Sequence, residues 1–303
     1  MNLKNKKKVL VFVHDAGGAE VIAAYIHKNQ KYEHFLIYGA GPAKKIFARL
    51  HIPLKHASES SADLRRIVEK HHNAASVLIA APGWMTKTET NAIKEAKRAN
   101  LRTVVYMDSW EDERKRFGYP SKGWKKILPH EFWAGDRYAY ANLRKQYPDI
   151  SVRLVPNQYF VNELFRYQTL KKKEPPPKAI LFLSQDRPGS DDLLKELIHV
   201  LENHKKGMSL RIRHHPIDDR NRYNAIIKSA RSRVDIVKSS EKDLVKDLLF
   251  ARIVVGTETT ALAVAALCGI KAISFLPKGA RRVLPFPKIK RIRSVSEIQI
   301  LIR

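Results

Sequence analysis

Residues 254–269 read VVGTETTALAVAALCG, and this stretch decides the fold class. An apolar run stops at Gly256, and a segment of small apolar residues then continues to Gly269. Short continuous apolar runs are typical of parallel strands that are buried on both faces. We therefore predict a buried strand, a turn in which Thr257 caps the next helix, and a small-residue helix that packs on the sheet.

The same alternation of strand and helix runs through the whole chain. Strands are expected in the first half at 8–13, 34–39, 76–81, 102–108, 131–135 and 152–156, and in the second half at 179–184, 210–215, 234–238, 252–256 and 271–276. Segments of helical period lie at 18–28, 43–50, 61–72, 87–99, 136–146, 190–203, 221–230, 241–250 and 258–267. The segment LKKKEPPPK at 170–178 can continue neither element type. The sequence thus predicts two Rossmann-like, doubly wound α/β domains, 1–169 and 179–303, which are joined by this linker and face a cleft.

Charge and cysteine content limit the partners and the compartment. Lysine and arginine number 57 against 30 acidic residues, so the formal net charge is +27, which predicts attraction to phosphates, nucleic acid or an anionic membrane face. No segment reaches the ~20 apolar residues of a membrane span, so any membrane contact is expected to be peripheral. Cys268 is the only cysteine and has apolar neighbours, which predicts a packed thiol in a reducing compartment. We expect a cytoplasmic protein that reaches the inner face of the membrane.

The turn after Gly256 is a candidate phosphate site. The amino end of a helix presents backbone N–H groups and the positive end of the helix dipole to an anion. The hydroxyls of Thr257, Thr259 and Thr260 could donate to a phosphate, and Glu258 could accept from ribose hydroxyls. The alternative is that these residues only cap the helix.

The stretch RIRHHP at 211–216 ends another strand of the second domain, so it is expected on the same rim as Gly256. Successive strand residues point to opposite faces, so only one of the two histidines is expected to reach a ligand, and His215 is preferred to His214. Arg213 would add positive charge to a developing phosphate anion. A purely structural loop entry is the alternative.

Two further glycine-bearing stretches resemble ligand-binding turns. In LSQDRPGSDD, Gly189 and Ser190 open a helix after a strand, and Arg187 could contact a diphosphate or simply be solvated. GAGPAK at 39–44 lacks the last glycine of a dinucleotide fingerprint, so NAD is not assigned. The sequence also shows no HExxH motif and no paired cysteines, and no metal is expected.

The first half carries its own candidate site. His14 and Asp15 follow the first predicted strand, and Gly17 and Gly18 then allow a tight turn and a close backbone approach to an acceptor. Asp15 is the candidate general base, with His14 as the neighbour that tunes it. Asp15 could instead accept hydrogen bonds from turn N–H groups. Asp108 ends another strand, where it could hold an acceptor hydroxyl or belong to an ion-paired loop.

At these residues the chain resembles bacterial glycosyltransferases of the GT-B type. The likeness spans nearly the whole length and rests on HDAGGAE, on the interdomain linker and on GTETTALAVAALCG. The H-P pair at 215–216 and the Thr-Thr pair at 259–260 also resemble elements of bacterial sialyltransferases and polymer-forming glycerophosphotransferases. In those families such elements hold the nucleotide phosphate, and an acidic residue of the amino-terminal domain is the base. The resemblance implies these roles for His215, Thr259, Thr260 and Asp15.

By this resemblance the protein would be a metal-independent glycosyltransferase of surface polysaccharide synthesis. Residues 179–303 would bind the nucleotide-activated sugar, which is a co-substrate, and no other cofactor is expected. Residues 1–169 would bind the acceptor. The expected partners are an anionic glycan or lipid-linked acceptor and an anionic membrane, rather than nucleic acid.

The chain also departs from these families, and rival functions remain. The sialyltransferase motif has two adjacent acids before its glycine, where this chain has only Asp15 followed by Ala16. Many GT-B enzymes carry a glutamate inside the second-domain helix, for which Glu258 is the nearest substitute. The rivals are a sugar-nucleotide epimerase or hydrolase of the same fold, a non-catalytic scaffold, and a nucleic-acid-binding protein. The last is suggested by the charge of +27, although no aromatic-basic binding motif appears.

Overall fold

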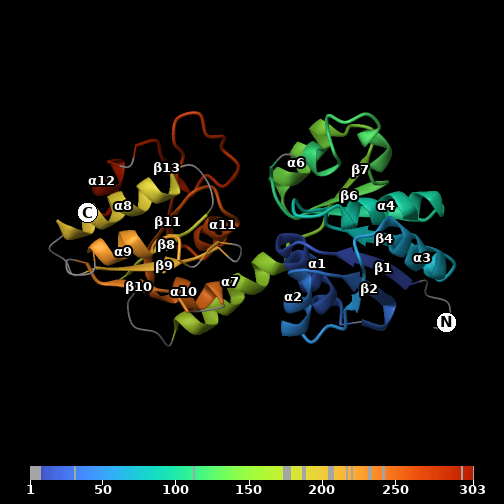
Figure 1. The fold of residues 1–303 in the computed structure, drawn as a ribbon, viewed down its shortest axis with the longest axis horizontal. Helices are drawn as coiled ribbons and strands as arrows, with labels where there is room; N and C mark the ends of the chain where they lie inside the picture. Colours follow the sequence, from blue (N-terminus) through green and yellow to red (C-terminus); the bar gives the residue numbers. More distant parts are fainter. Residues whose placement is uncertain are drawn as a thin grey trace. The chain divides into compact units, whose positions relative to one another are not determined.

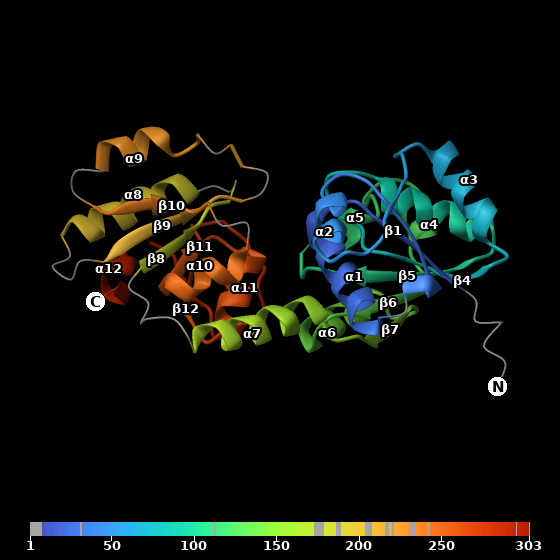
Figure 2. The same cartoon turned by 90° about the horizontal axis from the view of Figure 1, so that it is seen from below.

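The chain has 303 residues and divides into two compact units (Figures 1 and 2), here called the first unit (Met1–Tyr159) and the second unit (Phe160–Arg303). A computed structural model describes residues 8–30, 32–111, 113–172, 179–185, 189–203, 208–215, 218–219, 221–230, 234–240, 243–294 and 296–302. Helices lie on both faces of a parallel sheet in each unit, as Figure 2 shows. The prediction of two Rossmann-like α/β domains is therefore confirmed.

The first unit is built on a parallel sheet with the order β3-β2-β1-β4-β5-β6-β7. Its strands are β1 (Lys8–Val13), β2 (Phe35–Gly39), β3 (Lys55–His56), β4 (Ala75–Ala80), β5 (Arg102–Met107), β6 (Glu131–Ala134) and β7 (Ser151–Leu154). Its helices are α1 (Ala16–Asn29), η2 (Tyr32–His34), α2 (Ala43–Arg49), α3 (Ser61–His71), α4 (Thr88–Arg98), α5 (Glu113–Arg116), η3 (Trp124–Ile127) and α6 (Arg137–Gln146). The central strands are apolar and buried, because helices cover both faces.

The second unit contains a parallel sheet with the order β10-β9-β8-β11-β12-β13. Its strands are β8 (Ala179–Leu183), β9 (Ser209–Arg213), β10 (Ile236–Lys238), β11 (Ala251–Gly256), β12 (Lys271–Phe275) and β13 (Lys290–Ile292). Its helices are α8 (Ser190–Glu202), α9 (Asn224–Ala230), α10 (Leu244–Phe250), α11 (Thr260–Leu267) and α12 (Glu297–Ile302). Helix α7 (Gln158–Lys171) begins in the first unit and ends in the second.

Each unit has its own apolar core. In the first, α1 and α2 pack on side chains of the central strands, with Ile22, Ile26 and Phe47 almost fully buried. In the second, α8 and α9 pack on one face of the sheet, where Phe182 and Tyr223 are fully buried. These cores hold the carboxyl ends of the strands in fixed positions.

Both sheets reverse their winding order at a central pair of strands. In the first unit β2 lies on one side of β1 and β4 on the other, and in the second unit β9 and β11 flank β8 in the same way. The crevice at the carboxyl ends of such a pair is the usual ligand position in a doubly wound sheet. Functional residues are therefore expected in the segments after β1 and β4 of the first unit and after β8 and β11 of the second.

Several predicted boundaries differ from the structure. Helix α11 begins at Thr260, with Thr259 as its N-cap residue, so the prediction that Thr257 caps this helix is wrong. Helix α1 begins at Ala16, ahead of the predicted start, and β9 ends before the two histidines. The predicted linker, 170–178, overlaps the end of α7, and its residues 173–178 lie outside the described part of the chain.

Candidate functional site

His14 and Asp15 directly follow β1 and form a buried pair. Nδ1 of His14 lies 2.9 Å from Oδ1 of Asp15, and the two residues are 6 % and 8 % exposed. Nε2 of His14 lies 3.6 Å from Oε1 of Glu59, a side chain that is 58 % exposed. Gly41 has a φ of +54°, and a Cβ there would lie 2.5 Å from the imidazole ring. A buried carboxylate thus holds one ring nitrogen, while the other is turned toward an exposed carboxylate.

The loop after β4 fixes the second oxygen of Asp15. Oδ2 accepts the backbone N–H of Trp84 at 2.5 Å and that of Met85 at 2.8 Å. A Cβ at Gly83 would lie 1.8 Å from the same oxygen, so the loop can approach only because this residue is glycine. Both oxygens of the Asp15 carboxylate are therefore engaged at the switch point of the first sheet.

Glu89, in the first turn of α4, completes the cluster, although no sequence motif marks it as a site residue. Its Oε1 accepts the backbone N–H of His14 at 2.6 Å, and the residue is 1 % exposed. Burial, reinforced by the negative charge of Asp15, raises the pKa of Glu89 from 4.5 to about 8. Glu89 is therefore mostly protonated at neutral pH.

Asp108 follows β5 and lies beside the same cluster. Nη1 of the buried Arg116 donates to Oδ1 of Asp108 at 2.5 Å and to the carbonyl oxygen of Pro82 at 2.6 Å. A Cβ at Gly17 would lie 2.3 Å from Oδ2 of Asp108, and one at Gly18 would clash with the backbone that follows β4. These glycines lie in the first turn of α1. The predicted tight turn is therefore wrong at these two positions, and the glycines instead let loops approach the helix.

The turn between β11 and α11 lies at the switch point of the second sheet. Gly256 ends β11, where a Cβ would come within 3.1 Å of β8. Oγ1 of Thr257 donates to Oε1 of Gln185, which follows β8, at 2.9 Å. Thr259 makes no side-chain capping bond, and Thr260 is exposed. The hydroxyl of Thr259 is thus not used to cap its own helix.

Glu258 holds a loop of its own unit. Its Oε2 accepts the backbone N–H groups of Val283 and Leu284, each at 2.7 Å, and its Oε1 accepts the hydroxyl of Ser274 at 2.7 Å. Nε of Arg291 lies 3.4 Å from Oε1, and Glu258 is 4 % exposed. Both oxygens of the carboxylate are therefore engaged within the second unit, and the predicted contact with ribose hydroxyls stays a prediction.

His214 and His215 follow β9, which pairs with β8 on the side opposite β11. The ring of His214 packs on Tyr223, with 5.5 Å between centroids. Burial lowers the pKa of His215 and so favours the neutral imidazole, while the charge of Asp218 opposes this shift. With one strand between them, His215 and the turn after β11 are roughly 10 Å apart along the sheet edge.

Gly189 and Ser190 open α8, as predicted, and both lie against aromatic side chains of the second unit. Gly189 has a φ of +83°, and a Cβ there would lie 2.7 Å from the ring of Phe275. The hydroxyl of Ser190 is 3.3 Å from that of Tyr223, and Ser190 is 1 % exposed. Arg187, the third candidate of this stretch, lies outside the described residues.

Arg213, predicted to support a phosphate, is bound to a buried carboxylate. Its Nη1 donates to Oδ2 of Asp247 at 2.6 Å, and Nε of Arg211 donates to Oδ1 at 2.7 Å. The hydroxyl of Ser239 also donates to this carboxylate, and Asp247 is fully buried. Residues two apart on a strand share a face, which brings both arginines to Asp247.

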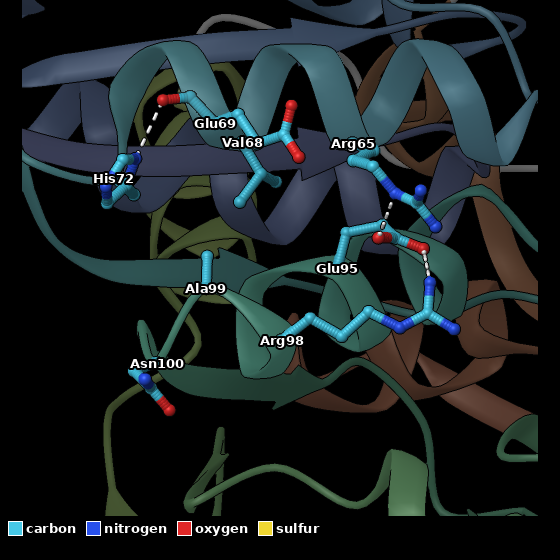
Figure 3. A pocket seen from close by; sticks show the side chains of 8 residues that line it. All are labelled: Arg65, Val68, Glu69, His72, Glu95, Arg98, Ala99 and Asn100. Carbon is cyan, nitrogen blue, oxygen red and sulfur yellow. Dashed lines mark hydrogen bonds and ion pairs between the residues drawn. The ribbon is translucent and has the colours of Figure 1, made fainter.

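A groove of about 510 Å³ lies between the second halves of α3 and α4 and contains none of the predicted site residues (Figure 3). On one side of it Glu95 is held by Arg65 and Arg98, at 3.1 and 2.6 Å. In a doubly wound unit the helices run antiparallel to the strands, so this groove lies toward the opposite edge of the sheet from His14.

Within the described ranges, no group of three or more His, Cys, Asp or Glu side chains is arranged to hold a metal ion. None of the helices in the described parts of the chain combines the length and the apolar character needed to cross a bilayer.

Comparison with known proteins identifies the fold. No protein-family model and no curated protein matches this sequence. Among solved structures, UDP-GlcNAc 2-epimerase from Neisseria meningitidis bound to UDP-GlcNAc has a TM-score of 0.71 at 14 % identity, covering 97 % of this chain and 90 % of that one. Anabaena HepE in complex with UDP-glucose has a TM-score of 0.63 at 12 % identity (97 % and 88 % covered). Acinetobacter baumannii MurG has a TM-score of 0.58 at 11 % identity (97 % and 90 % covered). The chain therefore has the GT-B fold, as predicted.

Proposed function

We propose that this protein transfers a sugar from a nucleotide-activated donor to a hydroxyl of a glycan or lipid-linked acceptor. The observation that carries the proposal is the buried His14–Asp15 pair at the switch point of the first sheet. Supporting it, two of the proteins with this fold named above were solved with UDP-GlcNAc or UDP-glucose bound. The product would be a surface polysaccharide or its lipid-linked precursor.

The geometry favours an exchange of the roles predicted for the two residues. Both oxygens of Asp15 are occupied, by the ring of His14 and by the amides of Trp84 and Met85. Nε2 of His14 is turned toward Glu59, which is exposed and can rotate away. We therefore assign His14 as the general base and Asp15 as the group that orients it.

In this reaction Nε2 of His14 accepts the proton of the acceptor hydroxyl as its oxygen bonds to the anomeric carbon. The bond from that carbon to the donor phosphate breaks, and its electron pair leaves with the nucleotide. In the second unit, the amide groups at the start of α11, the hydroxyls of Thr259 and Thr260, and His215 would stabilise the departing phosphate. None of these steps calls for a metal ion.

The test has a binding part and a kinetic part. Thermal shifts with CMP, CDP, UDP, GDP and TDP identify the nucleotide, since a ligand that binds the folded state raises its stability. His215→Ala and Thr260→Ala should weaken that binding. If both variants bound the nucleotide with wild-type affinity, the donor site could not lie at this turn.

The kinetic part separates the base from its orienting group. His14→Ala should lower kcat by about 10²- to 10⁴-fold with little effect on donor affinity. Asp15→Asn should lower kcat less than His14→Ala, because Nε2 of His14 is still present to accept the proton. Replacing His72, an exposed histidine on the other edge of the unit, should change neither. Full activity of His14→Ala would exclude it as the base.

A sugar-nucleotide epimerase is the second candidate, and one observation favours it. The same cluster contains a carboxyl that holds its proton at neutral pH, Glu89, beside the carboxylate of Asp15. Neighbouring carboxyls in different protonation states can serve as acid and base for proton transfer at a sugar carbon. Incubation with nucleotide sugars alone decides between the two: conversion to an epimer or to free sugar without any acceptor would overturn the transferase proposal.

A further inference from the structure

Residues 114–127 form a basic connector on the surface of the first unit. The sequence RKRFGYPSKGWKKI contains six arginines and lysines and no acidic residue. Five of these cations are exposed, and only Arg116 is buried. The exposed ones are Arg114, Lys115, Lys122, Lys125 and Lys126. A continuous segment of this length thus presents positive charge alone.

Large apolar side chains are exposed in and beside this connector. Tyr119 is 45 % exposed, and its ring meets that of Trp124 at a centroid distance of 5.5 Å. In the loop after β4, Trp84 and Met85 are 53 % and 58 % exposed. The guanidinium of Arg116 lies 4.8 Å from the centre of the Trp84 ring, which attaches this loop to the connector.

We propose that the basic connector and the Trp84–Met85 tip together dock this protein on an anionic lipid bilayer. Lysines and arginines near a membrane surface are attracted to anionic headgroups, and tryptophan and tyrosine favour the interface between headgroups and acyl chains. A purely ionic partner, such as nucleic acid or a soluble polyanion, would give no reason for exposed Trp84 and Met85 beside the cations. The combination of charge and apolar side chains therefore selects a bilayer.

This surface adjoins the acid–base cluster. The backbone N–H groups of Trp84 and Met85 bind Asp15, while their side chains are exposed. Docking would therefore bring His14 and Asp15 close to the lipid headgroups, where a lipid-linked acceptor presents its sugar. Only this last step rests on the proposed transferase function, and the docking itself does not.

The first test is cosedimentation of the full chain with vesicles of phosphatidylcholine and phosphatidylglycerol, against vesicles of phosphatidylcholine alone. The variant K122E/K125E/K126E is compared with K28E/K70E/K145E, which reverses the charge of three exposed lysines in the last turns of α1, α3 and α6, at the opposite edge of the sheet. Each lowers the net charge by six, from +27 to +21. We expect the wild type to bind only the anionic vesicles, the connector variant roughly a hundredfold more weakly, and the control variant within about threefold of wild type.

The second test uses vesicles with brominated acyl chains, which quench tryptophans that enter the bilayer. Trp110 and Trp133 are buried, so quenching should come from Trp84 and Trp124 and be lost in W84F/W124F. Equal losses in the two charge variants, wild-type binding to neutral vesicles, no vesicle binding, or binding without quenching would each overturn the proposal. Both tests omit donor and acceptor, and turnover with a water-soluble acceptor tests the proposed reaction separately.

Discussion

Replacing Glu89 by glutamine should flatten the pH dependence of the stability of the first unit. The pKa of Glu89 is about 8 in the folded protein, against an ordinary value of 4.5. Because folding favours the protonated form, this group's contribution to stability is fully present below pH 4.5 and is lost as the pH rises through about 8. At ~1.4 kcal/mol per pKa unit, this pKa difference corresponds to about 5 kcal/mol in the free energy of unfolding. Glu89 is 1 % exposed, so solvent screening subtracts little.

The assay is urea unfolding followed by tryptophan fluorescence. All four tryptophans lie in the first unit, so their signal reports its unfolding separately from that of the second. Between about pH 5 and pH 8 the free energy of unfolding of the wild type should fall by about 3.5 kcal/mol more than that of Glu89→Gln, whose amide oxygen can still accept the N–H of His14. Glu33→Gln, at a side chain that is 71 % exposed, controls for the loss of one carboxylate. Parallel pH profiles for wild type and Glu89→Gln would refute the reasoning.

Three further substitutions or reactions test other contacts. Burial and the nearby charge of Glu163 raise the pKa of Cys268 to about 12. A thiol reagent at pH 8 should therefore label Cys268 slowly in the native protein and rapidly in urea. Equal labelling rates in the two states would contradict this. Asp247→Ala leaves two arginines without their carboxylate and should destabilise the second unit by about 3 kcal/mol, measured by proteolysis in urea. Gly83→Ala should displace Asp15 and lower turnover at least as much as Asp15→Asn, and a fully active Gly83→Ala would show that the loop can shift.

The long elements were predictable because burial leaves a strong pattern in the sequence. Strands β1, β5, β8 and β11 are apolar over nearly their whole length, since helices cover both faces of each sheet. The edge strand β3 was missed because it is two exposed residues, Lys55 and His56, which carry no apolar signal. β13, α5 and α12 are similarly short. The longer α7 was also missed, although its 14 residues lie directly before the proline-rich segment.

The candidate site was only partly predictable for a different reason. Residues at strand ends, such as His14, Asp15 and Asp108, follow from topology, because parallel strands bring their carboxyl ends to one edge. Glu89 accepts a hydrogen bond from the backbone of His14, which lies 75 residues earlier in the sequence. No local sequence pattern predicts a contact between residues so far apart. The contacts of Glu258 and Arg213 were not predictable because their partners, the 283–284 amides and Asp247, also lie far away in the sequence.

The anchoring of residues 283–284 by Glu258 sets which part of the segment between β12 and β13 is open to redesign. The carboxylate fastens the middle of this segment to the start of α11. The preceding tip, which includes Lys278, Gly279 and Arg281, is exposed. The tip should therefore tolerate changes in its length and charge. An insertion at the anchored amides would instead break their bonds to Glu258 and disturb the start of α11.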